Sequence, residues 1–338
     1  MSGSAPAKPT YAQACAAFDW QVALDDLGWS GQTSVALAET IADRHARGTG
    51  EGRTAIHWIG ADGAERRVTF GELARQSARV GNRLRRLGVN PGDRVATVLP
   101  RIPQAMPAII GVLRAGAILV PMFTGFAPEA VGYRLRHSGA KVACVAARTR
   151  HLVPAIEGLS VVTVDDDGAL AGESEHCEPA RTTRNEPAAI IYTSGSTGPP
   201  KGGVIAANIL LAMWPYVHYG LDLRADDVFW PTGDPSWGYG LCCYLPALAA
   251  GASVLCVEGN ATPELCRDII GRCRVSNLAT TPTVLRSLMA QGDAIRAFGA
   301  SVRVISSCGE PLNGEVVGLT EARTNTSLRA TSSNLGWL

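Results

Sequence analysis

The interpretation of this sequence starts from the stretch Tyr192-Thr-Ser-Gly-Ser-Thr-Gly-Pro-Pro-Lys-Gly202. The apolar run before it, Ala188–Tyr192, predicts a buried strand, and the apolar residues from Val204 to Trp214 predict a helix after it. Glycines let a backbone approach an anion closely. Turn N–H groups form an anion-binding concavity, and a lysine adds a mobile charge. The pattern therefore predicts a site for a polyphosphate.

The loop differs from a Walker A loop, which ends in Gly-Lys-Ser/Thr. Here Pro200 precedes the lysine and Gly202 follows it. Proline lacks an N–H, so the loop cannot surround phosphate with a continuous row of amides. A flexible Gly/Ser linker is the alternative, but linkers rarely separate a buried strand from an apolar helix. The predicted phosphate-binding residues are Thr193, Ser194, Gly195, Ser196, Thr197, Gly198 and Lys201.

Composition narrows the class of protein. The formal net charge is +1, so nothing indicates nucleic acid or an anionic membrane as a partner. The nine cysteines are scattered without a CxxC pair or zinc spacing, which favours a reducing, cytoplasmic compartment. The start of the chain lacks the apolar core of a signal peptide. The longest apolar stretch, Ala105–Phe123, is interrupted by an arginine and two prolines, so no transmembrane segment is expected.

Strands and helices alternate twice along the chain, which predicts parallel βαβ units and an α/β, doubly wound fold. The box Thr69-Phe-Gly-Glu72 predicts the start of an amphipathic helix, and residues 56–59 and 67–69 predict a hairpin before it. We expect an irregular lead-in at 1–50 and a first α/β subdomain at 51–170. A second subdomain is expected at 186–317, followed by an irregular or disordered tail at 318–338.

The loop at 192–202 resembles the signature loop of the AMP-forming acyl-CoA synthetases, in the acyl-adenylate-forming superfamily. Leu113–Pro121 also resembles a segment of that family, although a helix end and a buried strand explain it equally well. The resemblance covers about residues 10–317. It implies two doubly wound, mostly parallel sheets with helices between and outside them, and it implies that the loop holds the β- and γ-phosphates of ATP.

Two further segments carry the resemblance. Asp234 and the residues after it resemble the loop beside the acyl pocket, which implies that Trp237, Gly238 and Tyr239 bound the acyl group. For Trp237, core packing is the alternative. The segment Gly309-Glu310-Pro311 resembles the one that lies against adenine, and its alternative is a simple strand-to-helix turn. No histidine has a recognisable catalytic spacing, and we expect His218 to be structural.

The resemblance ends near residue 317. The only lysines are Lys8, Lys141 and Lys201, so the family's C-terminal domain with its catalytic lysine is expected to be absent. We therefore assign no catalytic residue and no metal ligand. The segment Gly318-Leu-Thr-Glu321 matches the family's acidic segment only superficially, because it follows Gly314 too closely. We expect the chain to be the N-terminal portion of an enzyme, inactive or very weak by itself.

By resemblance, the intact enzyme activates a short-chain aliphatic carboxylic acid to acyl-AMP and then to acyl-CoA. The wording of the motifs is closest to that of acetyl-CoA synthetase-like enzymes. The implied partners are the carboxylic acid, ATP with Mg²⁺, and coenzyme A. Two alternatives stay open: an adenylation domain that loads a carrier protein, and a non-catalytic nucleotide- or acyl-binding fragment. The failed Walker pattern argues against a general NTPase.

Overall fold

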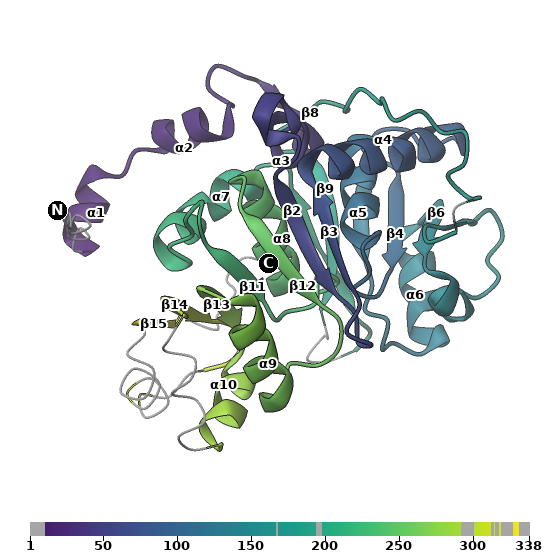
Figure 1. The fold of residues 1–338 in the computed structure, drawn as a ribbon. Helices are drawn as coiled ribbons and strands as arrows, with labels where there is room; N and C mark the ends of the chain where they lie inside the picture. The colour runs from purple at the N-terminus through teal and green to yellow at the C-terminus, as the bar shows by residue number, and fades with distance from the viewer. Residues whose placement is uncertain are drawn as a thin grey trace.

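The computed structural model describes residues 11–166, 168–193, 198–291, 301–311, 314, 318 and 327–330. These residues form two large, mostly parallel sheets with helices between and outside them (Figure 1). The predicted α/β fold class is confirmed. None of the helices in the described ranges is long and apolar enough to cross a membrane.

The first large sheet has six strands in the order β10-β9-β5-β4-β6-β7. All neighbouring pairs are parallel except β9 and β10, which form an antiparallel hairpin. The strands are β4 (Arg94–Val98), β5 (Ile118–Pro121), β6 (Val142–Val145), β7 (Ser160–Thr163), β9 (Pro187–Thr193) and β10 (Lys201–Ala206).

The second large sheet has seven strands in the order β15-β14-β13-β11-β12-β2-β3. Only β2 and β3 pair in antiparallel fashion. The strands are β2 (Thr54–Ile59), β3 (Glu65–Thr69), β11 (Val228–Pro231), β12 (Ser253–Val257), β13 (Asn277–Thr280), β14 (Val304–Ser307) and β15 (Ser327–Ala330). A two-stranded sheet joins β1 (Ser34–Val35) to β8 (Thr182–Thr183).

Helices connect the strands and cover the sheets. The α-helices are α1 (Tyr11–Ala17), α2 (Trp20–Leu27), α3 (Leu37–Ile41), α4 (Phe70–Arg86), α5 (Ala105–Arg114), α6 (Pro128–Ser138), α7 (Ile209–Pro215), α8 (Gly238–Ala249), α9 (Pro263–Cys273) and α10 (Pro282–Met289). Shorter helical turns are η1 (Asp43–Ala46), η2 (Gly48–Gly50), η3 (Ala147–Leu152) and η4 (Tyr216–Gly220). The predicted capping box at α4 is present: Glu72 N donates to Thr69 Oγ1 and Thr69 N donates to Glu72 Oε2.

The sheets do not divide the chain where the sequence predicts. The hairpin β2–β3 joins the second sheet, where Ile56 of β2 pairs with Val254 of β12. The strands β9 and β10 join the first sheet, where Ala189 of β9 pairs with Leu119 of β5. The hairpin β2–β3 of the expected first subdomain, 51–170, thus lies in the second sheet. The hairpin β9–β10 of the expected second subdomain, 186–317, lies in the first sheet. A strand's own residues predict that it pairs, but its partner depends on tertiary packing.

The segment after the glycine-rich loop begins as a strand, so the helix predicted at Val204–Trp214 is wrong in its first turns. Lys201–Ala206 forms β10, and the helix α7 begins at Ile209. The strand lies at the edge of its sheet, and Val204 is 61% exposed. An edge strand pairs on one side only, so backbone pairing with β9 is enough to fix it without a buried apolar pattern.

The tail also contains a strand that the sequence does not predict. Ser327–Ala330 forms β15, which pairs in parallel with β14 between Val304 and Ser327. This corrects the expectation that 318–338 is irregular, for the four residues concerned. The edge of β14 offers unpaired N–H and C=O groups, and backbone pairing needs no periodic side-chain pattern.

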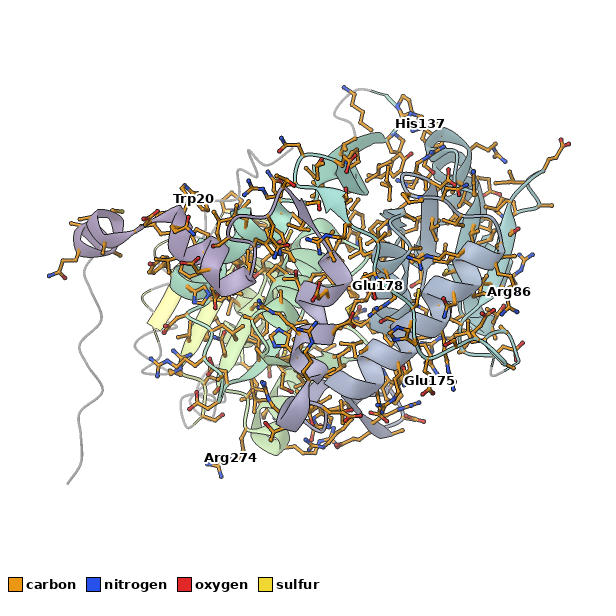
Figure 2. All side chains as sticks on the ribbon, turned by 90° about the horizontal axis from the view of Figure 1, so that it is seen from above. Trp20, Arg86, His137, Glu175, Glu178 and Arg274 are labelled. Atoms are coloured by element: carbon orange, nitrogen blue, oxygen red, sulfur yellow. The ribbon has the colours of Figure 1, made fainter. Side chains whose placement is uncertain are left out.

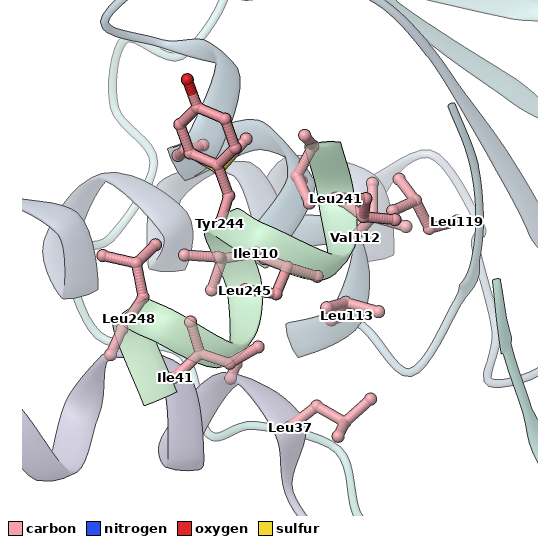
Figure 3. Close-up of a cluster of buried hydrophobic side chains, with 14 of the residues drawn as sticks. Leu37, Ile41, Ile110, Val112, Leu113, Leu119, Leu241, Tyr244, Leu245 and Leu248 are labelled. Atoms are coloured by element: carbon pink, nitrogen blue, oxygen red, sulfur yellow. The ribbon is translucent and has the colours of Figure 1, made fainter. Parts of the chain in front are cut away.

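The main core lies between the two sheets. Figure 3 shows α8 and α5 packed together, with Leu241, Leu245 and Leu248 near Ile110 and Ile41. Fully burying one such side chain contributes about 1.5 to 3 kcal/mol. Helix α8 follows β11 of the second sheet and α5 follows β4 of the first, so this core joins the two sheets.

The lead-in is more helical than expected. It contains α1, α2 and α3, and η1 and η2 follow α3. Figure 2 shows Trp20 on the N-terminal helices, which extend beyond the rest of the described chain. The side chain of Trp214 anchors this lead-in, because its Nε1 donates to Asp26 Oδ2 at 2.7 Å.

Candidate functional site

The predicted phosphate loop connects the antiparallel strands β9 and β10. Thr193 ends β9, Lys201 begins β10, and the two residues pair across the hairpin. Both are exposed, as is Gly198, whose φ of 112° is a conformation that favours glycine. The predicted contacts Ser194, Gly195, Ser196 and Thr197 lie outside the described residues. Among the residues that the structure describes, Lys201 makes no ion pair.

Side chains of helix α6 contact both ends of this loop, at Tyr192 before it and Pro200 after it. His137 Nδ1 lies 2.8 Å from the hydroxyl of the buried Tyr192. The guanidinium of Arg134 lies 5.5 Å from the centre of the Tyr192 ring. The hydroxyl of Tyr133 donates to the carbonyl of Pro200 at 3.4 Å. Burial raises the pKa of the Tyr192 phenol further above its usual value.

The predicted acyl-pocket residue Trp237 lies where the two sheets meet. It precedes α8, its indole is 40% exposed, and its ring centre lies 5.6 Å from those of both Phe123 and Phe126. These phenylalanines follow β5 of the first sheet, so the aromatic cluster of Phe123, Phe126 and Trp237 joins the two sheets. An exposed indole on an aromatic cluster can form one wall of an apolar site.

The other predicted aromatic, Tyr239, has different neighbours. Its hydroxyl oxygen is buried near Tyr216 of η4 and Cys243 of α8, and burial raises its pKa well above the usual value. Gly238 lies against β9, because a Cβ placed on it would be 3.7 Å from the Cγ2 of Ile191. Trp237 therefore faces the first sheet's aromatics, whereas Tyr239 faces the interior beneath α8.

The predicted adenine segment, Gly309-Glu310-Pro311, follows β14. Gly309 is exposed with a φ of 103°, so the chain turns sharply there. The Glu310 carboxylate accepts a hydrogen bond of 2.6 Å from Thr283 Oγ1 and pairs with Arg286, both on α10. The Thr283 hydroxyl and then the Arg286 charge hold the pKa of Glu310 below its usual value. Pro311 is exposed.

The three predicted segments lie close together. Ile191, two residues before the phosphate loop, lies against Gly238 of the acyl segment. Cys308, which immediately precedes the adenine segment, donates its N–H to the carbonyl of Thr280 at 3.2 Å. The Oγ1 of Thr280 lies 2.8 Å from the Oγ1 of Thr232, at the start of the acyl turn. Phosphate, acyl and adenine segments thus follow one another around the carboxyl ends of β9, β11 and β14, where open α/β sheets bind ligands.

The sequence did not single out Phe123, Phe126 or Arg101 as site residues. All three follow strands of the first sheet, β5 or β4, at the carboxyl edge. A search for large or charged side chains just beyond parallel strands would have found them. Their contacts with Trp237 and Asp234 could not be predicted, because those partners belong to the other sheet.

Metal-ligand clusters and cysteine thiols are further kinds of candidate site to consider within the described ranges. No group of three or more His, Cys, Asp or Glu side chains there could hold a metal ion. All nine cysteines are free thiols. Burial raises the pKa of several, including Cys144 to about 12, so these thiols are protonated and poorly nucleophilic at neutral pH.

A family model described as "AMP-binding enzyme" matches residues 42–330. This chain belongs to that family. It is 32% identical to acetyl-coenzyme A synthetase of Shewanella frigidimarina over 329 residues, which is 86% of this chain and 50% of the relative. It is 34% identical to acetyl-coenzyme A synthetase of Pseudoalteromonas translucida over 81% of this chain and 48% of the relative.

The crystal structure of an acyl-CoA synthetase from Brucella canis has the same fold. It superposes with a TM-score of 0.88 at 34% identity, covering 96% of this chain and 62% of that one. The chain is thus similar to AMP-forming acyl-CoA synthetases, as its motifs indicate. It spans about half the length of the curated relatives that it matches.

Proposed function

We propose that this chain provides the nucleotide- and acid-binding part of an ATP-dependent acid–CoA ligase. The reaction converts a short-chain aliphatic carboxylic acid to an acyl-adenylate and then to an acyl-CoA. The observation that carries the proposal is the arrangement of three segments at the carboxyl ends of both sheets. They are linked by the contact of Gly238 with Ile191 and by the hydrogen bonds that join Cys308 to Thr280 and Thr280 to Thr232.

Each segment has one role in the proposal. The β9–β10 hairpin, with Thr193 to Gly198 and Lys201, holds the β- and γ-phosphates of MgATP. Residues Gly309, Glu310 and Pro311 lie along the adenine. The segment Trp237, Gly238 and Tyr239 bounds the acid, with Trp237 as the wall that faces the aromatic cluster. The acid's carboxylate would then lie between phosphate and acyl segments, where it can meet the α-phosphorus.

The chemistry needs positioning and charge stabilisation more than a covalent protein intermediate. A carboxylate oxygen attacks the α-phosphorus of ATP, the bond to the bridging oxygen breaks, and pyrophosphate leaves with the electron pair. Holding the two reactants in line replaces a collision in solution. Lys201 and the loop donors offset the negative charge that accumulates on the phosphates.

The relatives support the choice of substrates. Two of them are acetyl-coenzyme A synthetases, which favours a short aliphatic acid and coenzyme A as acyl acceptor over a carrier protein. The free, buried thiols support a reducing compartment, and we propose the cytoplasm. Because the chain spans about half the length of these relatives, binding tests the proposal more directly than turnover does.

The test is a calorimetric titration of this chain with propionyl-sulfamoyl adenosine, a stable analogue of an acyl-adenylate. We expect one site per chain, with competition from MgATP and from propionate. The matched control is sulfamoyl adenosine without the acyl group, which should bind more weakly. A folded chain that binds none of these compounds would refute the proposal.

A further inference from the structure

One ion pair connects the turn that carries Trp237 to the opposite sheet. The Nε of Arg101, just beyond β4, lies 3.3 Å from Oδ2 of Asp234, just beyond β11. The two side chains are only 12% and 13% exposed. Breaking a buried pair leaves an uncompensated charge, so such a contact fixes the geometry of both partners.

Arg101 is itself held firmly by the second sheet. Its Nη1 donates to the carbonyl of Val257 at 2.8 Å, at the end of β12. Its own carbonyl accepts a hydrogen bond of 2.7 Å from Nε1 of Trp58, on β2. A residue of the first sheet is therefore anchored at two points of the second, which places its guanidinium accurately.

Asp234 transmits this position to Trp237. Its Oδ1 accepts a hydrogen bond of 2.9 Å from Ser236 N, and its carbonyl accepts one of 3.0 Å from Trp237 N. The turn packs tightly on the first turn of α8, since a Cβ on Gly240 would lie 2.0 Å from the Asp234 carbonyl oxygen. Any shift of the Asp234 carboxylate must therefore move the turn and the indole.

We propose that Arg101 and Asp234 form a positioning pair that sets the place of Trp237 and thereby the length of acid that the site accepts. This inference rests on the proposed function. Neither side chain contacts the acid. Two sets of contacts with residues that follow first-sheet strands then hold Trp237: the ion pair acts through the turn, and the rings of Phe123 and Phe126 contact the indole.

The test compares Arg101→Met, Asp234→Asn and the double variant with the unmodified chain. Asp234→Asn keeps an acceptor for Ser236 and so preserves the turn itself. The Kd ratio of acetyl- to butyryl-sulfamoyl adenosine should shift toward the longer analogue by about fivefold in each single variant. The double variant should show no further shift, and the Kd of MgATP should stay within about twofold. Arg101→Lys keeps the charge and should restore part of the selectivity.

A second readout does not depend on ligand binding. The chain has seven tryptophans, so the quenching of its fluorescence by acrylamide is measured with and without Trp237→Phe. The difference between the two measurements reports how accessible the Trp237 indole is. This contribution should increase in Arg101→Met and in Asp234→Asn. The control variant is Arg148→Met, which breaks another contact between the sheets, the pair of Arg148 with Glu258. It should change neither the selectivity nor the quenching.

The two readouts separate the possible failures. If the unmodified chain binds no adenylate analogue, the proposed function fails, while quenching still decides whether the pair positions Trp237. If the analogues bind but selectivity and quenching are unchanged in both single variants, the positioning role is refuted and the proposed function stands. Equal losses of affinity for ATP and for both analogues would also refute it, because they indicate general destabilisation.

Discussion

Lys201 should account for a measurable part of ATP affinity, and its replacement by alanine tests the phosphate loop. The side chain is exposed at the start of β10, opposite Thr193. No ion pair with a described residue competes for its charge. Lys201→Ala therefore removes one positive charge directed at phosphate and should disturb the fold very little.

The size of the effect follows from Coulomb's law. Two unit charges about 4 Å apart interact by about 1 kcal/mol in bulk water and by about 4 kcal/mol at the effective dielectric of a protein surface. An exposed lysine beside a partly enclosed polyphosphate falls between these limits, at about 1 to 3 kcal/mol. The Kd of MgATP should therefore rise by about five- to 150-fold.

The assay is calorimetric titration of MgATP at low salt, repeated at about 0.5 M salt, where screening should reduce the difference. Lys201→Arg should retain most of the affinity. The control is Lys141→Ala, which removes the other described lysine. The Nζ of Lys141 pairs with Asp93 Oδ2 at a distance of 2.7 Å, and neither residue belongs to the predicted site. Equal MgATP affinity in Lys201→Ala and the unmodified chain would show that this loop is not the phosphate site.

Three further predictions concern the acyl wall, pH and stability. Trp237→Ala should strengthen the binding of butyryl-sulfamoyl adenosine relative to that of the acetyl analogue by up to about tenfold, because apolar burial contributes about 0.8 kcal/mol per methylene. An unchanged ratio of the two Kd values would place the acid elsewhere. Burial lowers the pKa of His45 from 6.5 to about 4. Between these two pH values His45 is protonated in the unfolded chain but not in the folded one. The free energy of unfolding should therefore fall by about 1 to 2 kcal/mol as pH falls from 6.5 toward 4. Urea unfolding of His45→Gln at pH 7 and 5 should show a smaller loss than the unmodified chain, and an identical loss contradicts this. Arg114 is 3% exposed and paired with Asp43, so Arg114→Met should lower the free energy of unfolding by about 3 kcal/mol. The control Arg47→Ala removes an exposed arginine and should lower it by less than about 0.5 kcal/mol. Equal effects of the two substitutions would contradict this prediction.

Local sequence patterns predicted most elements of the fold. The capping box at Thr69 and Glu72 formed as expected, and so did the amphipathic helix that it starts, α4. These features depend on residues within a few positions of one another, so the sequence contains all the information needed. The alternation of strands and helices likewise predicted the α/β class.

The errors arose where partners distant in sequence decide the structure. Val204 belongs to an apolar stretch that suits a helix, but pairing of β10 with Ile190 of β9 makes it part of a strand. The hairpin β2–β3 lies next to α4 in sequence, yet pairs with β12. Strand partners are chosen by tertiary packing, which the residues of one strand do not encode.

The candidate site shows the same limit. Trp237 and Glu310 could be selected from the resemblance, and the structure places Gly238, next to Trp237, beside Ile191 of the strand that leads into the predicted phosphate loop. The ion pair of Arg101 with Asp234 joins residues of two different sheets. The sequence indicates Asp234 through the resemblance but not Arg101, because only the relative position of the sheets makes the two residues partners.

The most direct test of the account is hydrogen–deuterium exchange of this chain with and without saturating propionyl-sulfamoyl adenosine. The central claim is that one ligand contacts three segments. We therefore expect slower exchange together in peptides covering 187–206, 231–245 and 304–311, with no change in α4 on the outer face. Protection of only one of these segments, or protection confined to other parts of the chain, would contradict the claim that they form a single adenylate site.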